Sequence, residues 1–532
     1  MPILETKGAA SAQGFGFTAG FSGPVTYIED VFSTYLYTGN GATKVITNGI
    51  DLAGKGGLVW IKSRSAATDN ELFDTLRGSA ALNSNNTNAN AIPAGGGISA
   101  YNSNGFSMGG GVGYNDSGQT YVSWTFQEQA KFFDIVAYTG TGANRTIAHD
   151  LGSVPGCIIV KRIDSAGYDW RVYHRNLTSA SYAVDINSSS GETIRLTTWN
   201  STDPSNTVFS VGTDTSVNDS GGTYIAYIFA HNAGGFGLTG NDNVISCGPF
   251  TTDVSGGATV NLGYEPQLIM LKPINAGGGY WATSDAMRGM SYKTLKALFA
   301  TTAFAETPYS PALIPTATGF NLLPGLYGGS ISFIYIAIRR GPMKVPTTGT
   351  SVFEPVATTG TGATTTVSSP NFPVDLAIIR NRPDVQNAKF TDRLRGETLA
   401  FVSESSAAEG TDTQGVLGFD LQTGISVGSD TAYNKNATAM INWFFRRAPK
   451  FFDEVCYTGT GANTTQAHNL AAVPELLIVK RRDAAADWSV YSSSFANTEY
   501  LALNTTAAKA TDATYWNSTT PTASVFSLGT SA

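Results

Sequence analysis

The chain of 532 residues carries a formal net charge of −7, from 33 Lys and Arg against 40 Asp and Glu. Charged residues make up 14% of the chain, against about 25% in typical soluble proteins, while hydrophobic residues make up 42% and glycine occurs 59 times. The scattered charges include no basic block, which excludes a surface for binding a nucleic-acid backbone. The abundance of small neutral residues and glycine is typical of β-rich proteins rather than of helical enzymes.

The N-terminal residues 1–29 precede the first predicted strand and contain Phe15, Phe17 and Phe21 in the sequence GFGFTAGF. These residues include too few apolar side chains for a core of their own. Two interpretations stay open: a flexible leader, or a peptide that becomes ordered on docking to a larger assembly. The stretch lacks the basic start and apolar block of a secretory signal. Apolar runs such as 331–338 are far shorter than the roughly 20 residues of a membrane helix, so no membrane insertion is expected.

A repeated phrase organises the rest of the chain. KFFDIVAYTGTGAN at 131–144 returns as KFFDEVCYTGTGAN at 450–463. Related strand-and-turn segments lie at 34–41 and 353–362, with a degraded turn at 255–257. Each is followed by an apolar strand that ends in a basic residue, such as CIIVKR, and most copies close on an aromatic-rich strand, such as TYIAYIF. Self-similarity at this spacing predicts tandem domains of about 100 residues.

The predicted array has about five units. After the arm 1–29 they span 30–129, 130–231, 232–341 with a leading linker, 342–448 with a leading linker, and 449–532. The first, third and fourth units share an Asp-x-x-Arg-Gly element (type A), whereas the second and fifth share DWxVY and WNS (type B). The last unit lacks its closing strand, so Ala532 is not expected to be a natural domain end. Glycine- and proline-rich linkers predict looser coupling around the third unit than within the first–second and fourth–fifth pairs.

Each unit contains seven or eight segments typical of short strands, separated by clusters of Gly, Asn, Asp, Ser and Pro. This pattern predicts an all-β chain, a tandem array of antiparallel β-sandwich domains of jelly-roll type with an extended N-terminal arm. Since each sandwich is expected to bury its own core, the array is expected to be elongated and to tolerate gain or loss of a unit. The Gly-x-Gly turns are interpreted as hairpin turns, because no helix follows them as in a dinucleotide-binding loop.

The repeated phrase marks the two junctions at which a type A unit precedes a type B unit. Phe132 and Phe133 follow the short connection QEQAK, and Phe451 and Phe452 follow RRAPK. We predict that these four phenylalanines lie at the joints and fix the angle between adjoining units.

Candidate chemical sites are few. Cys157, Cys247 and Cys456 form no disulfide framework, and Cys456 stands where the first copy of the phrase has Ala137, which predicts a small buried hydrophobe rather than a nucleophile. The four histidines show no metal-ligand spacing, and the sequence contains no nucleophile elbow. No metal, cofactor, catalytic residue or enzymatic activity is therefore expected.

Two recurring elements have competing interpretations. The type A pairs predict a salt-bridged or turn-capping aspartate, either within its loop or facing the neighbouring unit, rather than a catalytic acid; the pairs are Asp74 and Arg77, Asp285 and Arg288, and Asp392 and Arg395. The type B aromatics Trp170, Tyr173, Trp488 and Tyr491 are candidate glycan contacts. A tryptophan recurring at one position of a sandwich repeat favours the core instead.

Several of these phrases together resemble a known family. FFDxVxYTGxG, LGxVP, IIVKR, WxVY, VFSVG, AHNAGGFGLTGND, YIAIRRGPM and DRLRG are similar to the repeats of large structural proteins of tailed bacteriophages, including phages of marine and cyanobacterial hosts. The resemblance covers nearly the whole chain from about Tyr27 onward. It implies concanavalin-like or jelly-roll repeats. The family has no established catalytic residues, so the resemblance transfers none to this chain.

The resemblance also implies a function. It indicates a virion structural protein, a tail fibre or tail-associated protein located in the virion tail. Phe15, Phe17 and Phe21 of the arm would anchor it to other tail or baseplate proteins, and the repeats would extend toward the host surface, where a glycan or receptor is a candidate partner. A homo-oligomer is expected, with a trimer favoured. The alternatives are a carbohydrate-binding adhesin, a glycan-degrading tailspike and a capsid-decorating head fibre.

Overall fold

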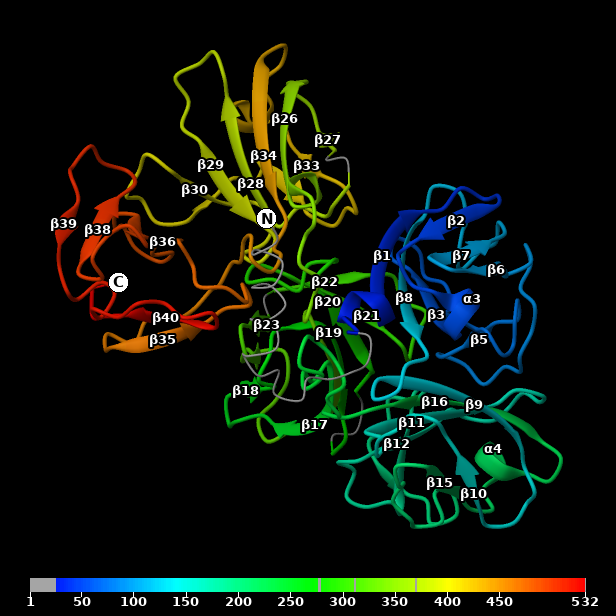
Figure 1. Ribbon diagram of the computed structural model, residues 1–532. Helices are drawn as coiled ribbons and strands as arrows, with labels where there is room; N and C mark the ends of the chain where they lie inside the picture. Colours follow the sequence, from blue (N-terminus) through cyan, green and yellow to red (C-terminus); the bar gives the residue numbers. More distant parts are fainter. Residues whose placement is uncertain (1–24, 276–278, 311, 369–370, 532) are drawn as a thin grey trace, which may run out of the picture.

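A computed structural model describes residues 25–275, 279–310, 312–368 and 371–531. In these residues the strands form ten sheets whose ladders are antiparallel, and the helices have only three or four residues each (Figure 1). The predicted all-β class is confirmed. No helix in the described ranges has both the length and the apolar character needed to cross a membrane. Phe15, Phe17 and Phe21 lie outside the described residues.

In chain order the sheets come in pairs, one larger and one smaller, within the ranges 30–129, 130–231, 232–341, 342–448 and 449–531, here called repeats 1 to 5. In repeats 1 to 4 the closing strand of the larger sheet lies between the first and second strands. The larger sheets are, in strand order, β1 (Phe32–Thr38), β8 (Thr120–Gln127), β3 (Gly57–Ser63), β4 (Glu71–Asp74) and β5 (Leu82–Asn83) in repeat 1; β14 (Thr193–Ile194), β13 (Tyr182–Asp185), β12 (Arg171–His174), β11 (Cys157–Arg162), β16 (Thr223–Phe229) and β9 (Phe133–Thr139) in repeat 2; β17 (Ile245–Thr251), β25 (Ser332–Arg339), β19 (Pro266–Pro273), β20 (Ala282–Asp285), β21 (Leu295–Phe299) and β22 (Thr307–Tyr309) in repeat 3; β26 (Phe353–Thr359), β34 (Ala439–Phe445), β28 (Leu376–Asn381), β29 (Lys389–Asp392), β30 (Leu399–Val402) and β31 (Gly410–Thr411) in repeat 4; and β36 (Leu476–Val479), β37 (Ser489–Ser492), β38 (Glu499–Ala502) and β39 (Ala510–Thr511) in repeat 5.

The smaller sheets and the short helices complete the repeats. The smaller sheet consists of β2 (Lys44–Thr47), β7 (Gly105–Met108) and β6 (Ile98–Asn102) in repeat 1, and of β10 (Arg145–Ala148) and β15 (Val208–Val211) in repeat 2. It consists of β18 (Ala258–Asn261), β24 (Gly319–Leu322) and β23 (Leu313–Thr316) in repeat 3, and of β27 (Thr365–Val367), β33 (Ile425–Val427) and β32 (Val416–Gly418) in repeat 4. In repeat 5 it consists of β35 (Thr464–Ala467) and β40 (Val525–Leu528). The helices are α2 (Ile28–Val31), α3 (Leu52–Lys55), α4 (Thr215–Asn218), α5 (Thr431–Asn434) and the 3₁₀ helix η1 (Gly349–Ser351).

The Gly-x-Gly turns are not hairpins, which corrects the sequence interpretation. β9 belongs to the larger sheet and β10 to the smaller one, so the turn between them carries the chain from one sheet to the other. Asn218 at the end of α4 holds this turn, because its side chain accepts from the Thr141 amide at 2.9 Å and donates to the Ala143 carbonyl at 2.7 Å. Gly140 packs so closely that a Cβ there would lie 2.2 Å from the Asp219 carbonyl oxygen. The turn is therefore a packed corner of the sandwich.

The two faces of each larger sheet pack against different neighbours. In repeat 1, Val59 and Ile61 point to the smaller sheet and pack with Ile46 and Phe106. Leu58, on the opposite face of the same strand, belongs to another apolar cluster. Since side chains alternate along a strand, the inner face builds the sandwich core, and the outer face needs a cover from outside the sandwich.

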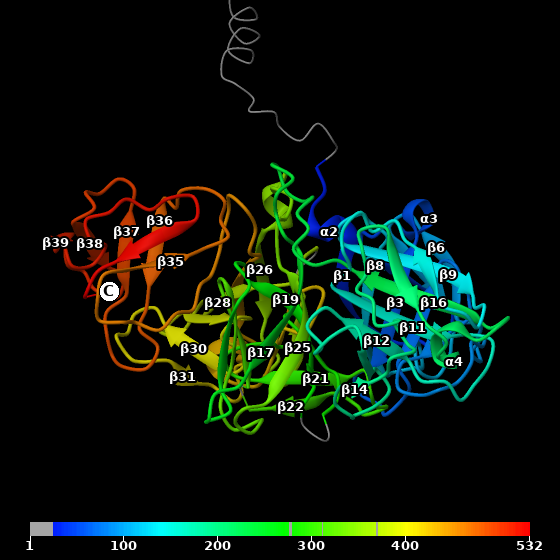
Figure 2. The ribbon, with the colours of Figure 1, turned by 90° about the horizontal axis from the view of Figure 1, so that it is seen from below.

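The outer faces of repeats 1, 2 and 3 cover one another. A single buried cluster contains Leu58, Trp60 and Trp124 of repeat 1, Ile159, Val172 and Tyr227 of repeat 2, and Leu268, Met270 and Ile336 of repeat 3. Figures 1 and 2 show repeats 1 and 2 at one end of the molecule and repeat 5 at the other, with repeats 3 and 4 between them. An elongated array with loose coupling around repeat 3 was expected, and this expectation is wrong. The apolar outer faces of the three sandwiches pack together in one shared core, because exposing these faces to water would be unfavourable.

Repeats 4 and 5 present the equivalent outer faces differently. Leu376 and Ile378 of repeat 4 are half-buried. Leu476 and Ile478 of repeat 5 are 59% and 43% exposed. The apolar side chains on the outer faces are therefore less exposed in repeats 1 to 3 because these three repeats pack against one another.

Candidate functional site: the joints between repeats

A lysine lies at or just after the C-terminal end of the second strand of the larger sheet in repeats 1, 2, 3 and 5 and reaches the adjoining repeat; it is buried in repeats 1 to 3 and partly buried in repeat 5. Each ammonium donates to one carbonyl of its own repeat and to one carbonyl of a neighbour: Lys62 to Thr68 and Ala303, Lys161 to Tyr168 and Thr87, Lys272 to Gly279 and Ser188, and Lys480 to Ala486 and Ser406. Burial lowers the pKa of Lys62, Lys161 and Lys272 to about 8. In the sequence, this lysine is visible only as a charge at the end of an otherwise apolar strand, and no neighbouring residue indicates its contact with another repeat.

A second donor lies beside each lysine and reaches the same turn of the neighbour. The indole N–H of Trp170 bonds the carbonyls of Asn83 and Asn86 in repeat 1, and that of Trp488 bonds those of Val402 and Ser405 in repeat 4. In repeat 3, the indole of Trp281 bonds the Asp185 carbonyl of repeat 2. Repeat 1 has the amide of Asn70 instead, which bonds the Phe299 and Thr302 carbonyls of repeat 3.

The placement of these aromatics corrects the glycan-contact hypothesis. Trp170 and Trp488 are buried at joints, and Tyr173 and Tyr491 are buried against Trp199 and Trp516 inside their own sandwiches. Stacking on a sugar needs an accessible ring face, and none of the four offers one. The core interpretation predicted the burial of the two tryptophans but not that they pack between repeats.

The direction of the lysine contacts shows that repeats 1, 2 and 3 form a closed ring. Repeat 2 donates to repeat 1, repeat 3 to repeat 2, and repeat 1 to repeat 3, through Lys161, Lys272 and Lys62 in that order. Each of the three repeats therefore donates once and accepts once, which forms a closed ring. Repeat 5 donates to repeat 4 through Lys480 in the same manner.

The Asp-x-x-Arg-Gly element combines both interpretations offered for it. Within its loop, Asp285 accepts from the Arg288 amide at 2.9 Å and from its guanidinium at 2.6 Å, both groups being fully buried. The pairs Asp74–Arg77 and Asp392–Arg395 have the same arrangement. The aspartate thus caps the turn and neutralises the arginine, as expected for a buried charge.

Two of these aspartates, Asp74 and Asp285, also bind the closing strand of an adjoining repeat. The Tyr227 hydroxyl of repeat 2 donates to Asp74 at 2.7 Å, and the Trp124 indole of repeat 1 donates to Asp285 at 3.0 Å. Tyr227 and Trp124 occupy the same place in their strands, since Tyr227 pairs with Ile159 and Trp124 with Trp60. In repeats 1 and 3, the type A aspartate therefore accepts one aromatic donor from the closing strand of a neighbouring repeat.

The four phenylalanines of the repeated phrase adjoin the closing strands of the preceding repeats. Phe132 and Phe133 are buried, with ring centroids 6.4 and 5.5 Å from Phe126 of repeat 1. Phe451 and Phe452 lie 6.3 and 5.6 Å from the equivalent Phe445 of repeat 4. The two junctions share one geometry, although Phe451 is 40% exposed.

Ionic contacts join repeats 4 and 5 to the first three. The Arg447 guanidinium binds both carboxylate oxygens of Glu265 in repeat 3, at 2.8 and 2.7 Å, and also binds Asp453 at 2.8 Å. Asp420 of repeat 4 lies 2.5 Å from Arg64 and 3.3 Å from Lys296. Burial acts to raise the pKa of Asp420, but Lys296 and Arg64 outweigh it and lower this pKa to about 2.

The cysteines and histidines form no reactive cluster in the described ranges. Cys157 and Cys247 are buried free thiols whose pKa is raised by burial, and Cys456 is partly buried. His174 lies at the joint of repeats 2 and 3, with Nε2 3.1 Å from the Tyr335 carbonyl oxygen. No group of His, Cys, Asp and Glu in the described residues has metal-binding geometry.

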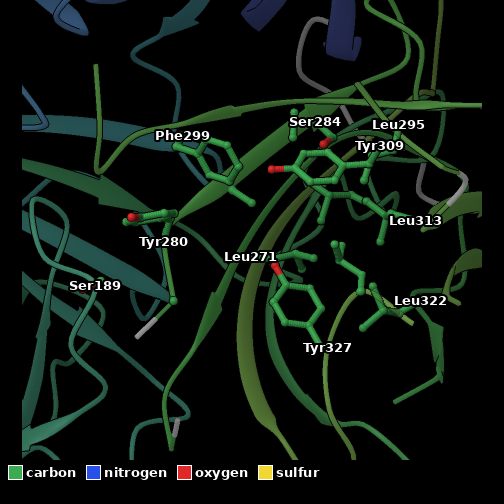
Figure 3. Close-up of a pocket in the computed structure, with 15 residues that line it drawn as sticks. Ser189, Leu271, Tyr280, Ser284, Leu295, Phe299, Tyr309, Leu313, Leu322 and Tyr327 are labelled. Atoms are coloured by element: carbon green, nitrogen blue, oxygen red, sulfur yellow. The ribbon is translucent and has the colours of Figure 1, made fainter. Parts of the chain in front are cut away.

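Repeat 3 contains a cavity of about 350 Å³ between its two sheets. Figure 3 shows Tyr280, Tyr309 and Tyr327 around it together with leucines of both sheets. Its described lining carries tyrosine and serine hydroxyls but no carboxylate, amine, guanidinium or imidazole. These groups suit apolar or stacking contacts and supply no acid–base pair.

Comparison with known proteins gives one family and no function. No curated protein matches this chain. The model of a family described as a domain of unknown function (DUF7483) matches residues 28–338 and 348–532. The match covers most of the repeats whose joints are described above, and the chain therefore belongs to the DUF7483 family.

Proposed function

We propose that this protein is a structural protein of a tailed-bacteriophage virion, a tail fibre or tail-associated protein. Its N-terminal arm anchors it to other tail proteins, its repeats face the host surface, and it assembles as a homo-oligomer. The proposal rests first on the similarity of its repeat phrases to such proteins, given above.

One structural observation supports a mechanical role above others. Repeats 1 to 3 share a single apolar core, and the buried polar groups that recur along the chain bridge repeats or brace the turns there. Burying side chains of both sheet faces gives a block without free hinges between its sandwiches. A rigid block of this kind suits the transmission of force and the positioning of an attached partner.

The location of the protein in intact virions tests this proposal. Mass spectrometry of purified particles is expected to find the chain in fixed stoichiometry to tail proteins. Gold-labelled antibodies against residues 1–24 are expected to mark the tail or baseplate. Labels on the capsid would instead identify a head fibre, and absence of the chain from purified particles would refute a virion role.

A carbohydrate-binding adhesin is the second candidate, favoured by the cavity of repeat 3. Tyr280 at this cavity is 40% exposed and lies 5.5 Å from Phe299 between ring centroids. Exposed aromatic rings beside hydroxyls are suited to stacking on sugars. A host-glycan array probed with the full chain tests it. Binding should be lost in Tyr280→Ala and kept in Leu238→Ala, a variant at an exposed apolar residue of the linker before repeat 3; silence of the array rejects this candidate.

A further inference from the structure

The cavity of repeat 3 lies between the two sheets of the sandwich and reaches the surface. Its volume is about 350 Å³, within the range in which proteins enclose small molecules. Leu271 lines it from the larger sheet, and Leu313 and Leu322 line it from the smaller sheet (Figure 3). Tyr280 and Leu326 also line it and are 40% and 36% exposed. A molecule in solution can therefore enter without separating the sheets.

The corner segment, defined as the residues between the last strand of the smaller sheet and the closing strand, is shorter in repeat 3 than in repeats 1, 2 and 4. It has nine residues, 323–331, against eleven in each of the others: 109–119, 212–222 and 428–438. The sixth residue of each longer segment packs into the core of its repeat; these residues are Tyr114, Val217 and Tyr433. In repeat 3, Leu326 and Tyr327 line the cavity instead.

Repeat 3 also lacks the asparagine that fastens the corner segment in the other repeats. Its side chain donates to the alanine carbonyl that follows the Gly-x-Gly turn and to the first carbonyl of the segment; the three are Asn115, Asn218 and Asn434. Residues 323–331 contain no asparagine. The corner of repeat 3 is therefore not fastened in this way, and the cavity lies beside it.

One strand position leaves further space in repeat 3. Ala282 begins β20, pairs with Leu271 and lines the cavity. The corresponding residue is long and charged in repeats 1, 2 and 4: Glu71, Arg171 and Lys389. Arg171 pairs with Asp185 at 2.6 Å, and Lys389 pairs with Asp412 at 2.9 Å. Paired residues lie on the same face of a sheet, so alanine at this position leaves to the cavity the space that these side chains fill.

The polar groups of the cavity are uncharged hydroxyls. Ser284 is only 3% exposed, and its hydroxyl has no hydrogen-bond partner among the described residues. The hydroxyls of Tyr309 and Tyr327, which also line the cavity, have none there either. A buried hydroxyl without a partner costs free energy. A ligand with a hydroxyl of its own would relieve this cost, whereas a charged ligand would find no counter-ion in the described lining.

Aromatic rings dominate one part of the lining. The ring centroids of Tyr280 and Phe299 are 5.5 Å apart at 65°, and those of Phe299 and Tyr309 are 6.5 Å apart at 87°. In the view of Figure 3, Phe299 and Tyr309 lie above the cavity and Tyr327 lies below it. Rings that meet edge to face attract one another, so a planar aromatic guest would extend this arrangement. A sugar inside the cavity would instead leave several hydroxyls unpaired.

We propose that the cavity of repeat 3 is a binding site for a small, uncharged aromatic molecule that carries a hydroxyl group. The ring system lies between the sheets among the leucines and aromatic side chains, and the hydroxyl bonds to Ser284. The short corner segment and Ala282 distinguish repeat 3 from repeats 1, 2 and 4 in this respect. The inference rests neither on the virion assignment nor on the binding of a sugar to the exposed ring of Tyr280.

Fluorescence titration of the full chain tests the proposal. The probe is N-phenyl-1-naphthylamine, an uncharged aromatic amine whose emission rises in apolar surroundings, and saturable one-to-one binding is expected. 2-Naphthol should displace it at a concentration at least about tenfold lower than naphthalene-2-sulfonate, because the sulfonate would be buried without a cation. 2-Naphthol should also act at a lower concentration than 1-octanol, an aliphatic alcohol of similar hydrophobicity.

Two variants inside the cavity locate the bound molecule. Ala282→Met fills the cavity at a position where three other repeats have a long side chain, so the repeat should fold while the affinity for the probe falls at least about tenfold. Ala53→Met, the same change at an exposed position of α3, should leave the affinity unchanged. Ser284→Ala should weaken the binding of 2-naphthol about fivefold, since one hydrogen bond is lost.

A variant at the rim gives a second measurement that does not depend on repacking the interior. Leu326→Asp places a charge at the entrance, and the affinity for the probe should fall at least about fivefold. Leu238→Asp is the matched control, because Leu238 is 71% exposed in the linker before repeat 3 and does not line the cavity. Circular dichroism establishes that each variant folds. The probe should raise the thermal unfolding midpoint of the wild type but not that of Ala282→Met.

Four outcomes would overturn the proposal. Without saturable binding of the probe, the cavity is not a binding site. Wild-type affinity in both Ala282→Met and Leu326→Asp would place the bound probe elsewhere. Displacement by naphthalene-2-sulfonate or by 1-octanol that is as effective as displacement by 2-naphthol would refute the class of ligand. Wild-type affinity of Ser284→Ala for 2-naphthol would refute the hydroxyl contact.

Discussion

The indole nitrogen of Trp124 lies 3.0 Å from a carboxylate oxygen of Asp285, and both groups are buried. This bond joins repeat 1 to repeat 3 across 161 residues of sequence. It repeats the bond between Tyr227 and Asp74 that joins repeat 2 to repeat 1. A buried carboxylate without hydrogen-bond donors costs free energy. The bond to the aromatic donor therefore stabilises the contact between two sandwiches and also fixes how they are placed against each other.

Replacing Trp124 by phenylalanine should weaken the shared core. The change keeps an aromatic ring but removes the N–H that Asp285 accepts, so the free energy of unfolding should fall by about 1–3 kcal/mol. Urea unfolding followed by circular dichroism measures it. The control is Trp443→Phe, at the equivalent position of repeat 4, whose indole N–H bonds no group in the described residues; its effect should stay within about 0.5 kcal/mol. Equal losses in the two variants would contradict the role of the bond.

Lys272→Met tests the joint between repeats 2 and 3, where the sequence predicted loose coupling. The variant keeps an apolar side chain of similar length but leaves the Ser188 and Gly279 carbonyls without the ammonium. A loss of about 1–3 kcal/mol in unfolding free energy is expected from two buried acceptors left unpaired. Lys55→Met, at an exposed position in α3, should be nearly neutral. If Lys272→Met is neutral as well, the joint is not held by the lysine.

Arg447→Met should loosen the attachment of repeats 4 and 5. The variant leaves the buried Glu265 carboxylate without its bidentate ion pair to the guanidinium. Removing one member of a buried ion pair lowers the free energy of unfolding by about 3–5 kcal/mol. Limited proteolysis is expected to cut faster between repeats 3 and 4 and to release repeats 1 to 3 as an intact fragment. Arg481→Met removes an exposed pair, Arg481–Asp483, and should not change the cleavage rate. A wild-type rate in Arg447→Met would show that other contacts hold the two parts together.

His174 should make stability depend on pH. Burial lowers its pKa from 6.5 to about 4, so the unfolded chain takes up a proton at a higher pH than the folded chain does. Its contribution is fully present above pH 6.5 and is lost as the pH falls toward 4, by about 3 kcal/mol in all.

Unfolding free energies at pH 7.5 and 5.0 measure this loss in wild type and in His174→Gln. The variant should lose about 2 kcal/mol less than wild type between the two pH values. Burial also lowers the pKa of His149 and His468, and since both remain in the variant, the difference reports His174 alone. Identical pH profiles would mean that His174 is not buried in its neutral form.

The sequence could reveal the local structure of this chain because strands and turns depend on neighbouring residues. Alternation and turn residues predicted β-sandwich repeats, and the spacing within the type A element placed Asp285 against Arg288, three residues apart. The same reasoning was wrong about the turn after β9. A Gly-x-Gly turn has the same sequence whether the next strand pairs with the last one or crosses to another sheet.

The candidate site was only partly predictable. Trp170 recurs with Trp488, which marked it as important, but a recurring tryptophan is compatible with a sandwich core, a sugar site or a joint. Lys161 was visible as a basic residue ending an apolar strand, and only the position of the Thr87 carbonyl, 74 residues earlier in the chain, shows why it is there.

The sequence by itself determined that this protein is an all-β chain of sandwich type, and it predicted that strands such as CIIVKR are buried on one or both faces. Only the tertiary structure decided what covers the outer faces. Apolar side chains require burial but do not specify a partner, so strings, stacks and rings of sandwiches all satisfy the same pattern. Directional bonds between buried groups far apart in sequence, such as Trp124 with Asp285, select the closed ring of repeats 1 to 3.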